Sequence, residues 1–100
     1  MSYRRLGSSG VTVSTLCIGT MMFGDRTDER EAGEIVALAK DRGINFIDTA
    51  DAYSLGESER ITGRLIAADR HHWILASKVG NPVGDGPNDR GLSRRWLMKA

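Results

Sequence analysis

The sequence predicts an α/β protein in which parallel strands alternate with helices, and three observations support that prediction. Largely apolar runs typical of strands begin near positions 15, 44 and 73, so the repeat is 29 residues long both times. Segments of helical periodicity lie between these runs, which is the pattern of strand–helix units. Alternation alone is compatible with a barrel or with an open doubly wound sheet. Residues 19–24, after the first strand, lack the GxGxxG spacing of the open dinucleotide-binding sheet, which favours a (β/α)8 barrel.

A short hairpin is expected before the first parallel strand. Residues 3–6 and 11–13 flank Gly7-Ser8-Ser9-Gly10, a strong turn signal. The first parallel strand is expected at residues 15–18, where an unbroken apolar run is typical of a strand buried on both faces. Cys17 would then be a small core residue and not a reactive thiol.

Three helices are expected between and after the strands. Thr27 or Asp28 can cap the first helix, and Gly43 suits the position just beyond its end. The second helix is expected at residues 57–68, and the third begins after Ser93. The first helix is expected to turn one broad apolar face inward, made of Ala32, Ile35, Val36, Leu38 and Ala39.

The second and third parallel strands both end at a charged residue. Apolar residues 44–47 precede Asp48, and residues 73–77 precede Lys78. The carboxyl ends of parallel strands lie on one face, which in a barrel is the face that carries the active site. We therefore expect Asp48 and Lys78 to be neighbours, about one strand spacing of ~4.8 Å apart, and able to form a partly buried ion pair. Tyr53 lies in the loop over the same face.

Asp48, Tyr53 and Lys78 together indicate proton transfer to a carbonyl oxygen. A free tyrosine keeps its proton at neutral pH, and a neighbouring ammonium group favours the phenolate. Such a phenol can donate a proton to a developing alkoxide, while Asp48 keeps Lys78 charged and in place. The set fits the reduction of a carbonyl by an external hydride donor. Taken singly, the same residues are more often a turn residue, a solvated cation and a packing residue.

Composition excludes several classes of protein. The 100 residues allow one domain, and a net charge of +1 without a basic stripe argues against a nucleic-acid partner. No apolar window approaches the ~18 residues of a membrane span. One cysteine permits no internal disulfide, so a cytoplasmic location is expected. His71 and His72 precede the third strand and are expected in a solvated turn at the barrel bottom, with no metal bound, because adjacent side chains point apart.

Residues 43–53, GINFIDTADAY, closely resemble the signature of the aldo-keto reductase family. The resemblance covers essentially the whole chain and is closest to the bacterial and potassium-channel β-subunit-like branches. It implies a (β/α)8 barrel of which residues 1–100 are the N-terminal portion, a hairpin plus about three strand–helix units of one domain. Further matching positions are Thr20, Gly56, Ser58, Glu59, Gly63 and residues 76–80, whereas Ser54 and Thr62 stand where Gly and Leu are expected.

The resemblance implies an oxidoreductase that reduces aldehydes or ketones to alcohols with NADPH or, less often, NADH. Tyr53 matches the family's proton donor, Lys78 the residue that assists it, and Asp48 the partner of Lys78. Thr20 and Met21 match positions that contact the cofactor, and Asp48 would lie near the nicotinamide ribose.

Further implications of the resemblance concern the pocket and the extent of the chain. Phe23 and Tyr53 are expected to line the carbonyl pocket. The family's catalytic histidine follows the fourth strand, and neither histidine of this chain matches it. A barrel needs roughly 250 residues, so we expect this chain to be an inactive fragment of a longer protein. A non-catalytic nucleotide-sensing or partner-binding module is the alternative. The sequence does not indicate which substrate is reduced, which of NADPH and NADH is preferred, or what the oligomeric state is.

Overall fold

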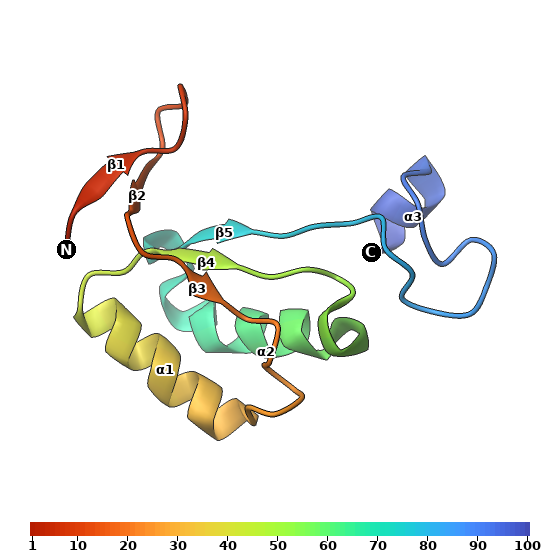
Figure 1. Ribbon diagram of the computed structural model, residues 1–100, viewed down its shortest axis with the longest axis horizontal. Helices are drawn as coiled ribbons and strands as arrows, with labels where there is room; N and C mark the ends of the chain where they lie inside the picture. Colours follow the sequence, from red (N-terminus) through yellow and green to blue (C-terminus); the bar gives the residue numbers. More distant parts are fainter.

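A three-stranded parallel sheet lies at the centre of the computed structural model, which describes residues 1–100 (Figure 1). Its strands are β3 (Ile18–Gly19), β4 (Phe46–Asp48) and β5 (Ile74–Ala76), in the order β3-β4-β5. Ile47 of the central strand pairs with Ile18 on one side and with Leu75 on the other. The parallel pairing of consecutive strands confirms the expectation from the 29-residue repeat.

The expected hairpin precedes this sheet and lies near the ends at which its strands begin (Figure 1). β1 (Tyr3–Arg5) pairs antiparallel with β2 (Thr12–Ser14). The Tyr3 hydroxyl donates a hydrogen bond to the Gly43 carbonyl oxygen at 2.6 Å, and Ser14 N donates one to Asn45 Oδ1 at 2.7 Å. These two bonds attach the hairpin to the segment that leads into β4.

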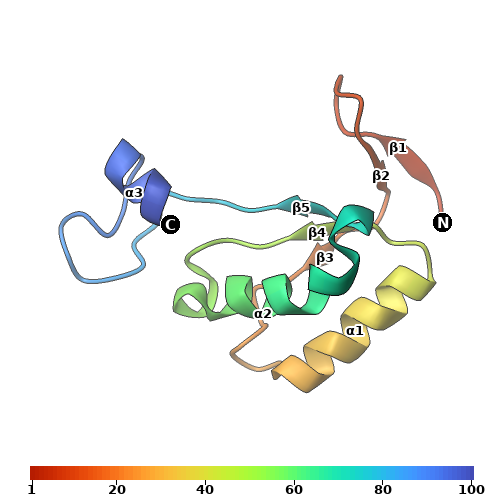
Figure 2. The ribbon, with the colours of Figure 1, turned by 180° about the vertical axis from the view of Figure 1, so that it is seen from behind.

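Two helices, α1 (Glu29–Asp41) and α2 (Glu57–Ile66), lie on the same side of the sheet (Figures 1 and 2). Asp28, one of the two predicted caps, starts α1 by accepting a hydrogen bond from Glu31 N at 2.8 Å. The α-helix α2 ends at Ile66, slightly before the predicted boundary, and continues as the 3-10 helix η2 (Ala67–His72). None of the helices is both long enough and apolar enough to cross a membrane.

The last helix, α3 (Arg94–Lys99), is separated from the sheet by the loop of residues 79–92 (Figure 1). As predicted, Ser93 caps it, since Ser93 Oγ accepts a hydrogen bond from Trp96 N at 3.1 Å. Trp96, on this helix, is buried. The carboxyl ends of β3, β4 and β5 point toward this end of the molecule.

The hydrophobic core fills the layer between the sheet and the two helices. Trp73, at the start of the third strand segment, is only 1% exposed and is the largest fully buried side chain. Burial of such side chains provides the main favourable free energy of folding. The core cluster consists of Ile18, Phe23, Ala32, Val36, Ala39, Ile47, Ile61, Ile66 and Trp73.

Two predictions about core residues are wrong. β3 is shorter than predicted and is an edge strand, and the residues before it, Leu16 and Cys17, are exposed. In α1 the inward stripe is narrower than predicted, because Ile35 and Leu38 are 44% and 56% exposed. The core-facing positions of α1 are Ala32, Val36 and Ala39 alone, at the spacing of a single helical stripe.

The two histidines differ more than predicted. His71 is exposed, as expected for a solvated turn. His72 is half-buried, and its Nε2 lies 3.1 Å from the Ile44 carbonyl oxygen, at hydrogen-bond distance. Its ring also meets that of Trp73 edge-on, with the ring centroids 4.8 Å apart. His72 therefore helps to attach the end of η2 to the segment before β4.

Candidate active site

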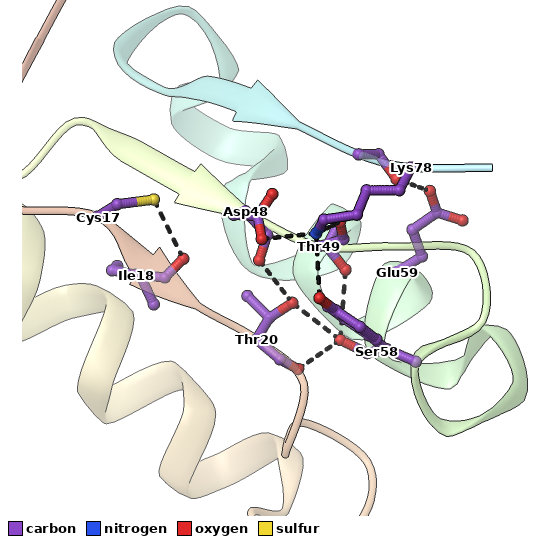
Figure 3. A network of polar contacts seen from close by, with 10 residues as sticks. Cys17, Ile18, Thr20, Asp48, Thr49, Ser58, Glu59 and Lys78 are labelled. Carbon is purple, nitrogen blue, oxygen red and sulfur yellow. Dashed lines mark hydrogen bonds and ion pairs between the residues drawn. The ribbon is translucent and has the colours of Figure 1, made fainter. Parts of the chain in front are cut away.

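Asp48 and Lys78 meet at the carboxyl ends of two adjacent strands (Figure 3). Asp48 is the last residue of β4 and pairs with Ala76, the last residue of β5. Lys78, two residues further on, reaches back so that its Nζ lies 2.6 Å from Asp48 Oδ2. The two side chains are 33% and 49% exposed, so the pair is partly buried. The predicted proximity of these two residues is confirmed.

The Lys78 ammonium group makes three hydrogen bonds. Its Nζ donates to Asp48 Oδ2 at 2.6 Å, to the Thr49 carbonyl oxygen at 2.9 Å and to Tyr53 Oη at 3.0 Å. An ammonium group has three N–H donors, so all of them are used. The hydrogen bond to Asp48, followed by that to Tyr53, raises the pKa of Lys78 above its ordinary value. Lys78 therefore stays positively charged at neutral pH.

Tyr53 reaches this cluster from a tight turn that follows β4. The turn is a short 3-10 segment, η1 (Tyr53–Gly56), in which Ser54 (φ 49°, ψ 40°) and Leu55 (φ 54°, ψ 38°) have left-handed backbone angles. Such angles are costly for any residue but glycine. The family resemblance leads one to expect glycine at position 54, and the left-handed conformation explains that preference. The Ser54 hydroxyl is buried without a hydrogen-bond partner.

Three buried hydroxyl groups lie next to the Asp48–Lys78 pair, two of them below it in the view of Figure 3. Thr20 follows β3, Thr49 follows β4, and Ser58 belongs to the first turn of α2; each is fully buried. Ser58 Oγ donates to the Thr20 carbonyl oxygen at 2.6 Å. Thr20 Oγ1 donates to the Asp48 carbonyl oxygen at 3.1 Å. Sequence reasoning missed this cluster, although a hydroxyl residue directly after each of two apolar strands was a visible signal.

An open hollow of about 540 Å³ lies beside Tyr53. Met21 and Tyr53 both line it, and their predicted contacts with a cofactor and a carbonyl substrate stay predictions. Phe23 does not line it: Phe23 is only 3% exposed and belongs to the hydrophobic core, so its predicted place in the carbonyl pocket is wrong. Thr20 is fully buried, with its hydroxyl engaged by Asp48, and its predicted contact with a cofactor stays a prediction. The lining residues are Met21, Met22, Gly24, Asp25, Ala52, Tyr53, Ser54 and Leu55.

The fold and this cluster define a known class of protein. Residues 15–100 match the Aldo/keto reductase family. The chain is 46% identical over 104 residues to a Bacillus subtilis protein named "Uncharacterized oxidoreductase YrpG". The match covers 93% of this chain and 32% of that protein. A solved aldo-keto reductase from Bacillus halodurans, in its holo form, superposes with a TM-score of 0.84 at 37% identity, covering 99% of this chain and 33% of that one. This chain belongs to the Aldo/keto reductase family.

A further relative comes from the branch that the sequence indicated. The chain is 39% identical over 105 residues to the Arabidopsis thaliana protein named "Probable voltage-gated potassium channel subunit beta", covering 99% of this chain and 31% of that protein. The chain thus spans about a third of the length of the relatives it matches. Its fold is the N-terminal portion of the barrel that the sequence predicted.

Proposed function

We propose that the protein carrying this segment is an oxidoreductase that reduces aldehyde or ketone carbonyls to alcohols with a nicotinamide cofactor. One observation carries the proposal: a single ammonium group, that of Lys78, donates hydrogen bonds both to Asp48 Oδ2 and to Tyr53 Oη. Family membership supports an oxidoreductase reaction, and this geometry supports Tyr53 as the proton donor. A cytoplasmic location and a small-molecule carbonyl partner belong to the same proposal.

Tyr53 is the proton donor in this proposal. Because Lys78 donates to Tyr53 Oη, the hydroxyl hydrogen of Tyr53 remains free to bond to a carbonyl oxygen in the adjacent hollow. As the carbonyl oxygen gains negative charge, the Tyr53 proton moves to it and a phenolate remains. The Lys78 ammonium, 3.0 Å from that oxygen, stabilises the phenolate, and Asp48 holds the ammonium in place.

The residues around Tyr53 fit a nicotinamide cofactor, NADPH or NADH. When bound, such a cofactor supplies the hydride that reduces the carbonyl carbon. Asp48 uses only Oδ2 for Lys78, and its side chain is 33% exposed, so Oδ1 is free to accept a hydrogen bond from a sugar hydroxyl. Met21 lines the hollow beside Tyr53, and the hollow has the size of an ordinary small-molecule site. Thr20 would act by shaping the loop that presents Met21.

Residues 1–100 by themselves are not expected to catalyse the reaction. The family resemblance places one further catalytic residue, a histidine, after the fourth strand, and the strands described here are the first three of the barrel. His71 and His72 cannot replace it, because both precede β5, whereas Lys78 follows that strand. Activity is therefore proposed for the complete gene product that contains this segment.

A second candidate function is a non-catalytic module that binds a nicotinamide nucleotide or a protein partner on the same fold. The relative named as a potassium channel subunit supports this candidate at 39% identity. The two candidates differ in turnover: a sensing or binding module would bind the nucleotide without consuming it at a useful rate.

The test is NADPH and NADH oxidation with a panel of simple aldehydes and ketones, on the complete gene product. Tyr53→Phe removes only the phenol oxygen, and loss of a general acid is expected to lower kcat by about 10²- to 10⁴-fold. Tyr3→Phe makes the same change in the hairpin, where the hydroxyl bonds to Gly43, and should leave kcat unchanged. Nucleotide binding without carbonyl reduction in the parent protein would favour the second candidate.

A further inference from the structure

We propose that Ser58 is a positioning residue, which holds the ends of β3 and β4 so that Asp48 and Thr49 keep the Lys78 ammonium beside Tyr53. The inference rests on the proposed function, because it concerns the same site. Ser58 does not touch Lys78 or Tyr53; it acts through the chain segments that do. Figure 3 shows Ser58 below Asp48, Thr49 and Lys78, on the side of the sheet covered by α2.

The position of Ser58 in α2 brings its hydroxyl to the strand ends. Gly56, the residue before the first turn, has φ 96°, a left-handed angle that turns the chain sharply into the helix. Ser58 is then the second residue of α2 and is fully buried. A serine near a helix start usually bonds to its own helix backbone. Ser58 bonds instead to Thr20, 38 residues earlier in the sequence.

The donor and the acceptor of each hydrogen bond in this cluster can be assigned from the contact between Ser58 and the Thr20 carbonyl oxygen. The shortest contact of Ser58 Oγ is 2.6 Å to the Thr20 carbonyl oxygen, which can only accept. The single Ser58 hydrogen is therefore used there. Thr49 Oγ1, 3.4 Å from Ser58 Oγ, then acts as a donor to it. Thr20 Oγ1, 3.0 Å from Ser58 Oγ, donates to the Asp48 carbonyl oxygen at 3.1 Å. One hydroxyl thus joins the segments after β3 and β4.

The end of β4 supplies two of the three acceptors of the Lys78 ammonium. One is the Asp48 carboxylate at 2.6 Å, and the other is the Thr49 carbonyl oxygen at 2.9 Å. The Asp48 carbonyl oxygen is also held from the β3 side, since it accepts Thr20 N at 3.1 Å as well as the Thr20 hydroxyl. A shift of the Thr20–Ser58–Thr49 contacts would move both acceptors and, with them, the ammonium.

The next residue of α2 holds the strand from which Lys78 extends. Glu59 Oε1 accepts a hydrogen bond from Ser77 Oγ at 2.6 Å, and Ser77 directly precedes Lys78. The first turn of α2 is therefore attached to the chain after β3, β4 and β5. This arrangement is what a rigid support for a proton-transfer group requires, because displacements near 1 Å can cost on the order of a hundredfold in rate.

Ser58→Ala tests the inference on the complete gene product. Removal of the hydroxyl leaves the Thr20 carbonyl oxygen and the Thr49 hydroxyl without this buried partner, so the Asp48–Thr49 segment is free to shift. We expect kcat for carbonyl reduction to fall on the order of tenfold, with KM for the nucleotide little changed. In addition, the pKa of Lys78, followed by NMR of the labelled lysine side chain, should fall toward its ordinary value as its contact with Asp48 loosens.

Thr62→Val is the matched control. Thr62 is also buried in α2, one turn beyond Ser58, but its hydroxyl has no hydrogen-bond partner. The replacement removes a buried hydroxyl at nearly constant volume, and we expect kcat and the Lys78 pKa to stay as in the parent protein. A purely structural effect of Ser58→Ala would lower stability without moving the Lys78 pKa, so the Lys78 pKa distinguishes it from a loss of positioning.

The outcomes separate this inference from the proposed function. If the parent protein turns over but Ser58→Ala behaves like Thr62→Val in both kcat and Lys78 pKa, Ser58 is not a positioning residue. If the parent does not turn over, the proposed function fails, and the Lys78 pKa alone still decides the role of Ser58. Should Ser58→Ala fail to fold, Thr49→Val removes the hydroxyl that donates to Ser58 at nearly constant volume and is expected to change kcat and the Lys78 pKa in the same direction.

Discussion

Ser54, in the turn after Tyr53, combines a left-handed backbone with a buried hydroxyl that has no hydrogen-bond partner. Its φ of 49° is left-handed, which costs roughly 1–2 kcal/mol for a residue with a Cβ atom. Its buried, unpaired hydroxyl adds about 1–3 kcal/mol. Glycine removes both costs but loses about 0.5–1 kcal/mol through the greater entropy of the unfolded chain. We expect Ser54→Gly to raise the free energy of unfolding by about 1 kcal/mol or more, measured by urea denaturation.

Ser54→Ala separates the two contributions, because it removes the hydroxyl and keeps the Cβ atom. A gain in stability from alanine equal to that from glycine would mean that the relief of backbone strain only offsets the entropy cost of glycine. A loss of stability in Ser54→Gly would show that the Ser54 side chain contributes favourably to the turn, contrary to this prediction.

The hydrogen bonds of Lys78 also predict how the stability of the protein depends on pH. Its pKa is raised in the folded protein by the hydrogen bonds to Asp48 and Tyr53. A raised pKa means that the stabilisation is fully present below the ordinary lysine pKa of about 10.4 and is lost as the pH rises through the folded value. The stability difference between the parent protein and Lys78→Met should therefore be constant through neutral pH and shrink in strongly alkaline solution.

Lys99→Met is the control for this pH dependence, because Lys99 forms no ion pair. Its stability difference from the parent should not change over the same alkaline range. Half of the Lys78 side chain is exposed, so the effect is small and is best measured at low salt, where screening is weakest. An effect of Lys78→Met that grows with rising pH would contradict the prediction.

The residues of the site differ in how far the sequence can predict them. Asp48 and Lys78 were predictable, because each lies at the carboxyl end of an apolar strand and parallel strands bring these ends together. Ser58 was not predictable as a partner of Thr20, because that contact depends on how closely α2 approaches the sheet. The error at Phe23 has a related cause: sequence position places it in the loop after β3, but only the packing shows that its ring enters the core.

At the scale of the element, α1 depends on its capping residue. Asp28 Oδ1 accepts the hydrogen bond from Glu31 N at 2.8 Å, and its negative charge lies at the positive end of the helix. Asp28→Ala is expected to lower the free energy of unfolding by about 1 kcal/mol. Asp28→Asn keeps an oxygen acceptor and should cost much less. Circular dichroism during urea denaturation measures both, and equal losses for Ala and Asn would show that the charge, and not the cap, is what matters.

Element positions could be predicted more closely than element burial. Caps and turn residues mark boundaries locally, so Asp28, Ser93 and the hairpin turn were identified from neighbouring residues alone. Burial depends on which neighbour an element has. Leu16 is apolar but precedes an edge strand, and Ile35 lies on α1 beside the stripe that meets α2, so both are exposed despite their composition.

At the scale of the whole molecule, the helices cover only one side of the sheet (Figure 2). β3 and β5 are both edge strands, and the structure measures 44 × 35 × 20 Å, with α3 lying beyond the strand ends. Only 18 of its 100 residues are buried, which is a small core for a chain of this length. The layout is that of strand–helix units whose second sheet face and edges have no cover within residues 1–100.

This layout predicts that residues 1–100, produced by themselves, unfold with little cooperativity. Apolar side chains at both ends of the molecule are exposed, among them Leu16 at 58%, Leu92 at 70% and Met98 at 72%. Open strand edges favour pairing between copies. We expect a broad urea transition, binding of a hydrophobic dye and concentration-dependent association in sedimentation, whereas the complete gene product should unfold in a sharper transition without dye binding. A monomeric 100-residue chain with one sharp transition would contradict this, and would mean that the layer between the sheet, α1 and α2 is a sufficient core.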